Sequence, residues 1–197
     1  ERVAIVDWDV HHGNGTEAIF YDRADVLTIS IHQDRCYPID TGAATDIGDN
    51  RGEGYNMNIP LPPGGGHTLY LEAMERLILP RLREFQPDII IIACGFDASA
   101  IDPLARMLAT SETFGQLTKF VMGAAHELCS DRLSMIHEGG YSEVYVPFCG
   151  HRVIQELSNS SIKAEDPYKF LFESRQPSKR VQNFYSELIT ELEQFFF

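Results

Sequence analysis

Residues 87–99, PDIIIIACGFDAS, contain the run that decides the fold class. The segment 89–93 is continuously apolar and mostly β-branched, and it follows the helix breaker Pro87. Such a run is typical of a strand inside a parallel sheet, where helices cover both faces and leave no polar side to the strand. We therefore expect a central strand at residues 89–93, buried on both faces.

Other strand-like and helix-like stretches alternate along the chain. Strand-length apolar runs occur at residues 3–6, 26–31, 55–61 and 133–136. Apolar residues at helical spacing predict helices over residues 69–85, 112–128 and 144–157, the second of them entered through Thr110 and Ser111 as caps. This order predicts an α/β fold, a three-layer sandwich whose mostly parallel sheet is flanked by helices. The polar segment 33–54 is predicted to be a surface loop near the site.

The composition excludes several classes of protein. With 197 residues, 16 basic and 29 acidic side chains, the chain has a net charge of −13 and enough length for one domain. The acidic excess disfavours direct nucleic-acid binding, which depends on clustered Lys and Arg. The four cysteines are widely spaced and no long apolar stretch occurs, so neither a disulfide scaffold nor a membrane span is predicted. We expect a cytoplasmic protein, with the nucleus as the other location in a eukaryote.

Acidic residues and a histidine follow two of the predicted strands. Asp7, Asp9 and His11 have i, i+2, i+4 spacing after the first strand, which on extended backbone points them to one face, and Asp97 follows the strand at 89–93. Ligand sites of parallel sheets open at the carboxyl ends of strands, so Asp9, His11 and Asp97 are predicted to form a three-ligand site with an open position, as catalytic zinc requires. Spacing alone leaves a hydrogen-bonded turn with capping carboxylates as an alternative, and the ligand set also suits Mn²⁺ or Fe²⁺.

Three ordered segments carry a family resemblance. DWDVHHGNGT at residues 7–16 resembles the metal-binding strand end of the histone deacetylase family. GFDAS at 95–99, followed by Asp102, Pro103 and Leu104, resembles its second ligand segment, and HEGGYS at 137–142 resembles its glycine-rich loop with a catalytic tyrosine. The pattern is most similar to class II and bacterial deacetylase-like amidohydrolases, relatives of acetylpolyamine amidohydrolases, and it extends over residues 2–157.

The resemblance implies roles for individual residues. It makes Asp9, His11 and Asp97 the ligands of Zn²⁺, Asp7 the carboxylate that orients a catalytic histidine, and Tyr141 the donor to the oxyanion. It also implies substrate contacts from Tyr37 on one wall of an acyl-lysine tunnel, Leu104 on the opposite rim, and Gly140 in the glycine-rich loop.

The histidines outside the ligand set are predicted to be structural. Sites for monovalent cations are implied by the resemblance alone. His12 faces away from His11 on extended backbone and is treated as structural, and His32 is predicted to be buried with satisfied hydrogen bonds. The resemblance further implies K⁺ sites. One lies near the main chain of Asp7, Asp9, His11 and Ser30, and another lies around Phe20, Val26 and Tyr55.

The implied function is a zinc-dependent amidohydrolase that removes acetyl or other acyl groups from lysine side chains of proteins and peptides, or from small N-acyl amines. The first alternative is a deacetylase-like module that binds acyl-lysine or a partner without turnover. A manganese hydrolase with an arginase-like sheet is the other alternative, but it needs further Asp ligands for a second ion.

The family also carries a tandem histidine pair upstream of the metal strand, which acts as general base and acid. Because no such pair is present here, the resemblance implies that residues 1–197 form a single, incomplete catalytic domain. Either its amino-terminal part is missing, or a partner chain contributes that part, or the chain is a degenerate homologue. The chain alone is expected to be inactive or weakly active. Residues 158–197 are predicted to be a carboxyl-terminal extension whose terminal helix, over 179–197, docks its aromatic end on the body or on a partner.

Overall fold

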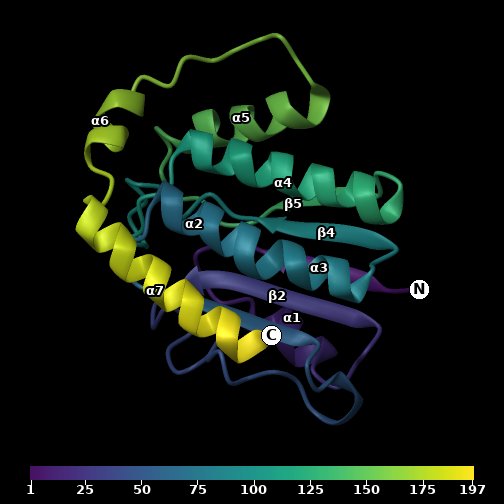
Figure 1. The fold of residues 1–197 in the computed structure, drawn as a ribbon. Helices are drawn as coiled ribbons and strands as arrows, with labels where there is room; N and C mark the ends of the chain where they lie inside the picture. Colours follow the sequence, from purple (N-terminus) through teal and green to yellow (C-terminus); the bar gives the residue numbers. More distant parts are fainter.

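A five-stranded, fully parallel sheet forms the centre of the computed structural model, which describes residues 1–197 (Figure 1). Its strands are β1 (Val3–Asp7), β2 (Val26–Gln33), β3 (Asn56–Leu61), β4 (Ile89–Cys94) and β5 (Leu133–His137). The strand order is β3-β2-β1-β4-β5, so that β1 lies between β2 and β4. All five predicted strands are present, and the predicted α/β fold with a parallel sheet flanked by helices is confirmed.

The helices connect the strands in the predicted alternation. They are α1 (Asn14–Phe20), α2 (His67–Ala73), α3 (Leu79–Phe85), α4 (Ser111–Cys129), α5 (Val146–Ser158), α6 (Lys169–Ser174) and α7 (Lys179–Phe196). The helix predicted over 69–85 begins at His67, and a π-helical turn at Met74–Ile78 joins α2 to α3. The sequence pattern does not predict helix α1, because this helix buries none of its residues and so has no apolar periodicity.

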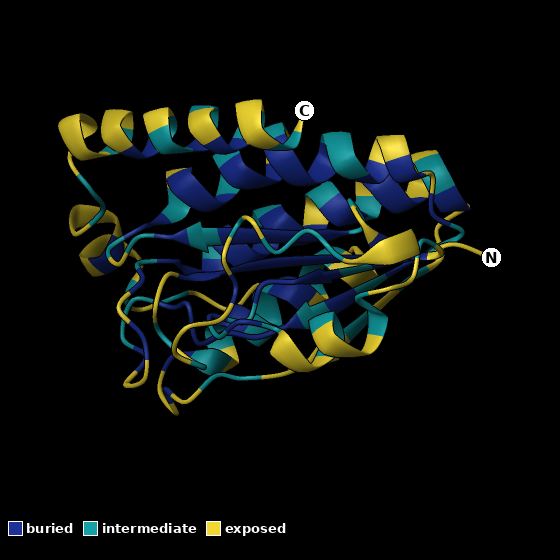
Figure 2. Cartoon of the chain, turned by 90° about the horizontal axis from the view of Figure 1, so that it is seen from below, coloured by how far each residue is buried: buried dark blue, intermediate teal, exposed yellow.

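Helices cover the two faces of the sheet unequally. Figure 1 shows α2, α3 and α4 across one face, with α5 beside α4 and α7 outside α2, whereas α1 lies on the other face beside β2. Figure 2 shows the buried residues concentrated in the sheet and in the helix layer next to it, while α7 turns an exposed side outward.

The prediction that strand 89–93 is buried on both faces is wrong. Along β4, Ile90 and Ile92 are fully buried, but Ile89 and Ile91 on the other face are only half-buried. The reason is that α1, the one helix on that face, contacts β2 and does not extend over β4. Edge strand β5 is more open still, with Ile136 45% exposed.

The carboxyl-terminal extension folds back onto the body. Helix α7 buries Tyr185, Ile189 and Leu192 against α2 and the π-helical turn. Arg76 strengthens this contact through a hydrogen bond of 2.9 Å to the Oγ1 atom of Thr190. Of the aromatic end, only Phe196 packs against the core, whereas Phe195 and Phe197 are exposed.

Of the two predicted caps of helix α4, Thr110 is the N-cap and forms a capping box, whereas Ser111 lies inside the helix. The Thr110 side chain accepts a hydrogen bond from the backbone N–H of Thr113, and the Thr113 hydroxyl accepts one from the backbone N–H of Thr110. Ser111 is the first helical residue, and its hydroxyl donates to Asp166 at 2.6 Å, which ties the extension to the start of α4.

Replacing Thr110 with alanine tests this cap. Thr110→Ala removes the acceptor for a buried N–H, so the free energy of unfolding should fall by about 1 kcal/mol. Thr110→Ser keeps the hydroxyl and should retain most of the stability. Urea denaturation of the three proteins measures the difference, and equal stability of the alanine and serine variants would show that the cap contributes nothing.

Candidate metal centre and its cavity

The polar residues predicted at the strand ends lie together at the carboxyl edge of the sheet. Strands β1 and β4 are paired side by side, with Asp7 opposite Ala93. The segments that follow the two strands therefore leave the sheet next to each other. One ligand atom each from Asp9, His11 and Asp97 lies within 4.8 Å of the others. The structure thus brings together the three residues predicted to hold a metal.

Backbone turns, and not strand alternation, give Asp9 and His11 their positions. Strand β1 ends at Asp7, whose Oδ1 atom accepts a hydrogen bond of 2.9 Å from the backbone N–H of Asp9. In the same way, Oδ1 of Asp9 accepts a bond of 2.9 Å from the backbone N–H of His11. Each acidic side chain therefore orients the residue two positions later, and the i, i+2, i+4 spacing works through Asx-type turns.

Hydrogen bonds from distant backbone groups hold the two carboxylates. The N–H of Gly139 donates to Oδ2 of Asp9, and the N–H of Val10 donates to Oδ1 of Asp97, both at 2.7 Å. Oδ2 of Asp97 is fully buried and has no hydrogen-bond partner, although the Nδ1 atom of His11 lies 3.0 Å from it. A buried carboxylate oxygen without a partner is costly, and a bound cation removes that cost.

The electrostatics of the cluster also favour a cation. Burial raises the pKa of Asp97, and the nearby charge of Asp9 raises it further. Burial likewise raises the pKa of Asp7 well above its usual range, again with a contribution from Asp9. The hydrogen bond to Asp9, together with the carboxylate of Asp97 3.0 Å away, raises the pKa of His11 to about 10. Two carboxylates and one imidazole therefore share a proton in a site whose donor set fits Zn²⁺, Mn²⁺ or Fe²⁺.

Two glycines let the backbone approach the carboxylates closely. A Cβ atom on Gly139 would overlap the Oδ2 atoms of both Asp97 and Asp9, and a Cβ atom on Gly95 would overlap Asp9. Gly139 belongs to the HEGGYS segment and Gly95 to the GFDAS segment. The lack of space for a Cβ atom explains why both positions are occupied by glycine.

A cavity of about 880 Å³ opens above the cluster. Asp7, Asp9 and His11 line its floor, while Tyr37, Leu104 and Tyr141 line its sides and are 65%, 53% and 49% exposed. The His11 ring lies between the two tyrosines, with ring centroids 6.1 Å from Tyr37 and 6.2 Å from Tyr141, edge to face. Gly140, with φ of 145°, completes the wall next to Tyr141.

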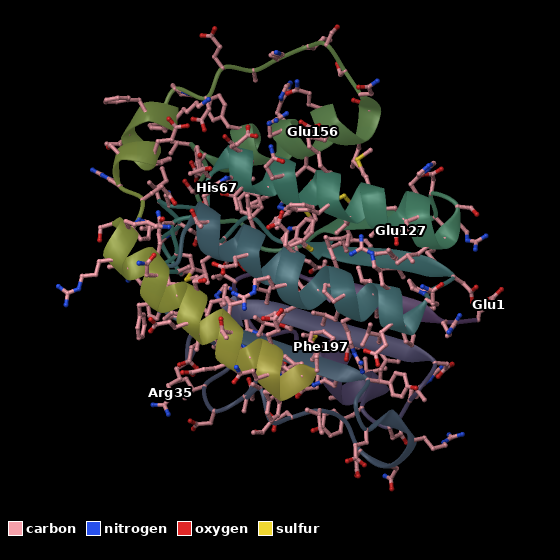
Figure 3. The ribbon with its side chains drawn as sticks, viewed as in Figure 1. Glu1, Arg35, His67, Glu127, Glu156 and Phe197 are labelled. Carbon is pink, nitrogen blue, oxygen red and sulfur yellow. The ribbon has the colours of Figure 1, made fainter.

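The cavity lies at the end of the molecule toward which the strands run. Figure 3 labels Arg35, in the segment after β2, and His67, at the start of α2, on this left-hand side, whereas Glu1 lies on the right. This placement follows the general rule that ligands of open parallel sheets bind outside the carboxyl ends of the strands.

Asp102 connects two sides of the cavity, a role that the sequence prediction missed. Its buried carboxylate accepts hydrogen bonds from the backbone N–H of Leu104 at 2.9 Å and from that of Tyr141 at 2.8 Å. The residue was visible in the sequence only as part of the segment after GFDAS, and its partner Tyr141 is 39 positions away.

The residues predicted around monovalent cations fall into two separate places. Ser30 lies opposite Asp7 in the sheet register, beneath the metal-ligand cluster, and its hydroxyl accepts a hydrogen bond of 3.3 Å from the backbone N–H of Gly13. The second group lies toward the other end of β2. Val26 begins that strand, and the carbonyl of Tyr55 accepts a bond from the backbone N–H of Thr28, while Phe20 is the last residue of α1.

With this geometry established, comparison with known proteins assigns the family. Residues 1–157 match the family model described as histone deacetylase domain. The chain belongs to the histone deacetylase family. It is 52% identical over 192 residues, 98% of this chain, to a histone deacetylase-like amidohydrolase of Pseudomonas aeruginosa, and 38% identical over 173 residues, 87% of this chain, to a probable deacetylase of Archaeoglobus fulgidus.

Solved structures of family members have the same fold. The structure of the histone deacetylase Clr3 superimposes on all of this chain with a TM-score of 0.82 and 31% identity, covering 32% of the Clr3 chain. That of acetylpolyamine aminohydrolase from Burkholderia pseudomallei covers 83% of this chain and 46% of its own, with a TM-score of 0.73 and 33% identity. The chain spans about half the length of the curated relatives it matches: 50% of the Pseudomonas aeruginosa protein and 48% of the Archaeoglobus fulgidus protein. None of its helices has the length and apolar character needed to cross a membrane.

Replacing Gly139 with alanine tests the close approach at this deacetylase-family site. The Cβ atom of Gly139→Ala must displace the carboxylates of Asp9 and Asp97, so affinity for a divalent cation should fall by about tenfold or more. Gly123→Ala is the matched control, because a Cβ atom there meets nothing within 4 Å. Titration with Zn²⁺ measures both variants, and equal affinity would show that the glycine loop does not constrain the ligands.

Proposed function

We propose that the protein is a zinc-dependent deacetylase that hydrolyses the amide of acetylated or otherwise acylated lysine side chains, or of related N-acyl amines. The observation that carries the proposal is the unpartnered, buried Oδ2 atom of Asp97 beside Asp9 and His11, on the floor of a cavity flanked by two tyrosines. The relatives, which include the histone deacetylase Clr3 and an acetylpolyamine aminohydrolase, support acetylated amines as the substrate class.

Asp9, His11 and Asp97 would hold the ion. When bound, Zn²⁺ supplies a Lewis acid that polarises a carbonyl and lowers the pKa of water. The Nδ1 atom of His11 and the carboxylate oxygens of both aspartates face one another, which leaves the cavity side open for substrate. Three protein ligands with one open side are typical of catalytic zinc.

The walls of the cavity fit an acylated amine with an aliphatic stem. Tyr37 and Leu104 present exposed apolar surface along the cavity, and Gly140 contributes no side chain that would narrow it. Because Leu104 carries no charge, it favours the neutral stem of acyl-lysine over a second ammonium group. The stem of the substrate would thus lie against the apolar surface of Tyr37 and Leu104 above the ligand cluster.

Tyr141 is proposed to donate a hydrogen bond to the substrate carbonyl oxygen. Its ring packs edge to face on the ligand His11, and Asp102 holds its backbone. Burial, together with the charges of Asp97 and Asp9, raises the pKa of the Tyr141 hydroxyl, so the proton is present at neutral pH. A donor aimed at the oxygen where negative charge develops stabilises the tetrahedral intermediate.

Asp7 is proposed to orient the general base, and that base is proposed to come from polypeptide outside these 197 residues, of the same protein or of a partner chain. The histidines that line the cavity are engaged elsewhere. His11 contacts both aspartates, His12 contacts Glu17 and Thr41, and His137 packs against Phe96. Full turnover is therefore expected of a longer protein, with this chain alone weakly active or inactive.

The decisive experiment combines a tyrosine variant with metal analysis. In a form of the protein that includes the remaining length of its relatives, Tyr141→Phe should lower turnover of an acetyl-lysine peptide by about 10² or more, because one oxyanion donor is lost. Zinc content should stay the same. Turnover near that of the unchanged protein would remove Tyr141 from the mechanism, and zinc and peptide binding without any turnover would favour the non-catalytic module.

The pH dependence of zinc binding tests the ligand assignment in the present chain. Because His11 has a pKa raised to about 10, it carries a proton at neutral pH and must lose it to bind the ion. Zinc affinity should therefore rise about tenfold per pH unit between roughly pH 6 and pH 9, with about one proton released. Isothermal titration in buffers of different ionisation enthalpy counts that proton. Asp97→Asn should abolish tight binding, and affinity unchanged by pH would contradict the assignment of His11.

A further inference from the structure

The segment that carries Tyr37 has little secondary structure of its own. Between β2 and β3, residues 34–55 contain only one 3₁₀ turn, at Asn50–Gly52, yet Cys36, Tyr37 and Pro38 form one wall of the cavity. A wall of this kind holds its place only if contacts from outside the segment fix it.

Buried polar side chains lie beneath this segment and bind it. We name them the polar platform, made up of His12, Glu17, His32, Asn56 and Asn58. All except Glu17 are at most 5% exposed, and none of the platform residues has a fully buried side-chain polar atom that lacks a hydrogen-bond partner. Burying amides and imidazoles is costly unless they are hydrogen-bonded, so these contacts are strongly favoured over open arrangements.

Four hydrogen bonds run from the platform to residues 41–46 of the segment. They are His12 Nδ1 to Thr41 Oγ1 at 2.9 Å, His32 Nε2 to the Gly42 carbonyl at 3.1 Å, Asn58 Nδ2 to the Ala43 carbonyl at 3.3 Å and Asn56 Nδ2 to the Asp46 carbonyl at 2.5 Å. Burial lowers the pKa of His32 to about 4, so its ring is neutral at pH 7, with Nε2 as the donor to the carbonyl.

Glu17 holds the platform together from α1. Its Oε2 atom accepts hydrogen bonds from Asn58 at 2.6 Å, Asn56 at 2.7 Å and His12 at 3.3 Å. Burial acts to raise the pKa of Glu17, but the hydrogen bonds outweigh it and lower the pKa. One carboxylate thus fixes three side chains that each also bind the segment.

His12 and Thr41 extend this anchoring to the wall itself. The backbone N–H of His12 donates to the carbonyl of Tyr37 at 3.0 Å, and the Thr41 hydroxyl lies between Nδ1 of His12 and the carbonyl of Pro38, 2.9 Å from each. Because His12 directly follows His11 in the chain, the contacts of His12 connect the ligand cluster to the wall that contains Tyr37.

We propose that the polar platform is a positioning device for the substrate: it fixes the Tyr37 wall relative to His11 and so determines how tightly the acyl chain is held. This proposal rests on the proposed deacetylase function for its substrate. His12 and Thr41 are positioning residues, since they hydrogen-bond the wall and not the reacting atoms, and Glu17 acts on the wall through His12.

A substitution of Thr41 tests the proposal with little effect on folding, because Thr41 lies at an exposed position in a loop. Thr41→Val keeps the shape and removes the hydroxyl between His12 and Pro38. In the full-length, zinc-loaded protein it should raise KM for an acetyl-lysine peptide about tenfold, with kcat and zinc affinity little changed. Thr41→Ser should restore the value. Thr45→Val, at a threonine of the same segment for which no side-chain hydrogen bond occurs, is the control and should change nothing.

Hydrogen exchange supplies a readout that does not depend on catalysis. The backbone N–H of His12 is protected by the Tyr37 carbonyl, so it should exchange faster in Thr41→Val and not in Thr45→Val. Unchanged exchange, or faster exchange with an unchanged KM, overturns the proposal. If the unchanged protein neither binds nor hydrolyses the peptide, the proposed function fails and the substrate-holding role fails with it, whereas faster exchange would still establish the anchoring of the wall.

Discussion

The electrostatic repulsion between Asp9 and Asp97 is the constraint on which the candidate site depends. Both carboxylates lie at the carboxyl ends of neighbouring strands, where burial and their mutual charge disfavour ionisation of Asp97. Backbone N–H groups of Val10 and Gly139 and the imidazole of His11 offset part of this repulsion. The buried Oδ2 atom of Asp97 is left without a hydrogen bond, and a bound divalent cation would satisfy it.

The surroundings of the cluster show how the chain keeps these charges in place. Glycines at 95 and 139 allow the backbone to come within contact distance of the carboxylates. Asp102 links the Leu104 and Tyr141 walls through two backbone hydrogen bonds, and the polar platform anchors the Tyr37 wall from the other side. Each wall is therefore fixed by hydrogen bonds to the framework, which limits the movement of exposed aromatic residues above the ligands.

Sequence patterns predicted the strands and long helices well because each buries an apolar face with a clear period. They failed where that signal is absent or misleading. Helix α1 buries no residue, and the apolar run of β4 was expected to be covered on both faces although helices lie over only one of them. For the site, alternation along a strand predicts the grouping of Asp9 with His11, but β1 ends at Asp7 and Asx-type turns produce the grouping instead.

The sequence by itself determined the α/β architecture, the order of its strands along the chain and the residue types at the strand ends, since local periodicity and short motifs carry that information. Only the tertiary structure decided which distant groups meet. The contacts of Asp9 with Gly139, Asp102 with Tyr141, and Glu17 with Asn56 and Asn58 join residues 39 to 130 positions apart. The first two contacts arise because the parallel sheet places the segments that follow the carboxyl ends of separate strands side by side. The contacts of Glu17 arise because the buried amides of Asn56 and Asn58 need hydrogen-bond partners that no local pattern specifies.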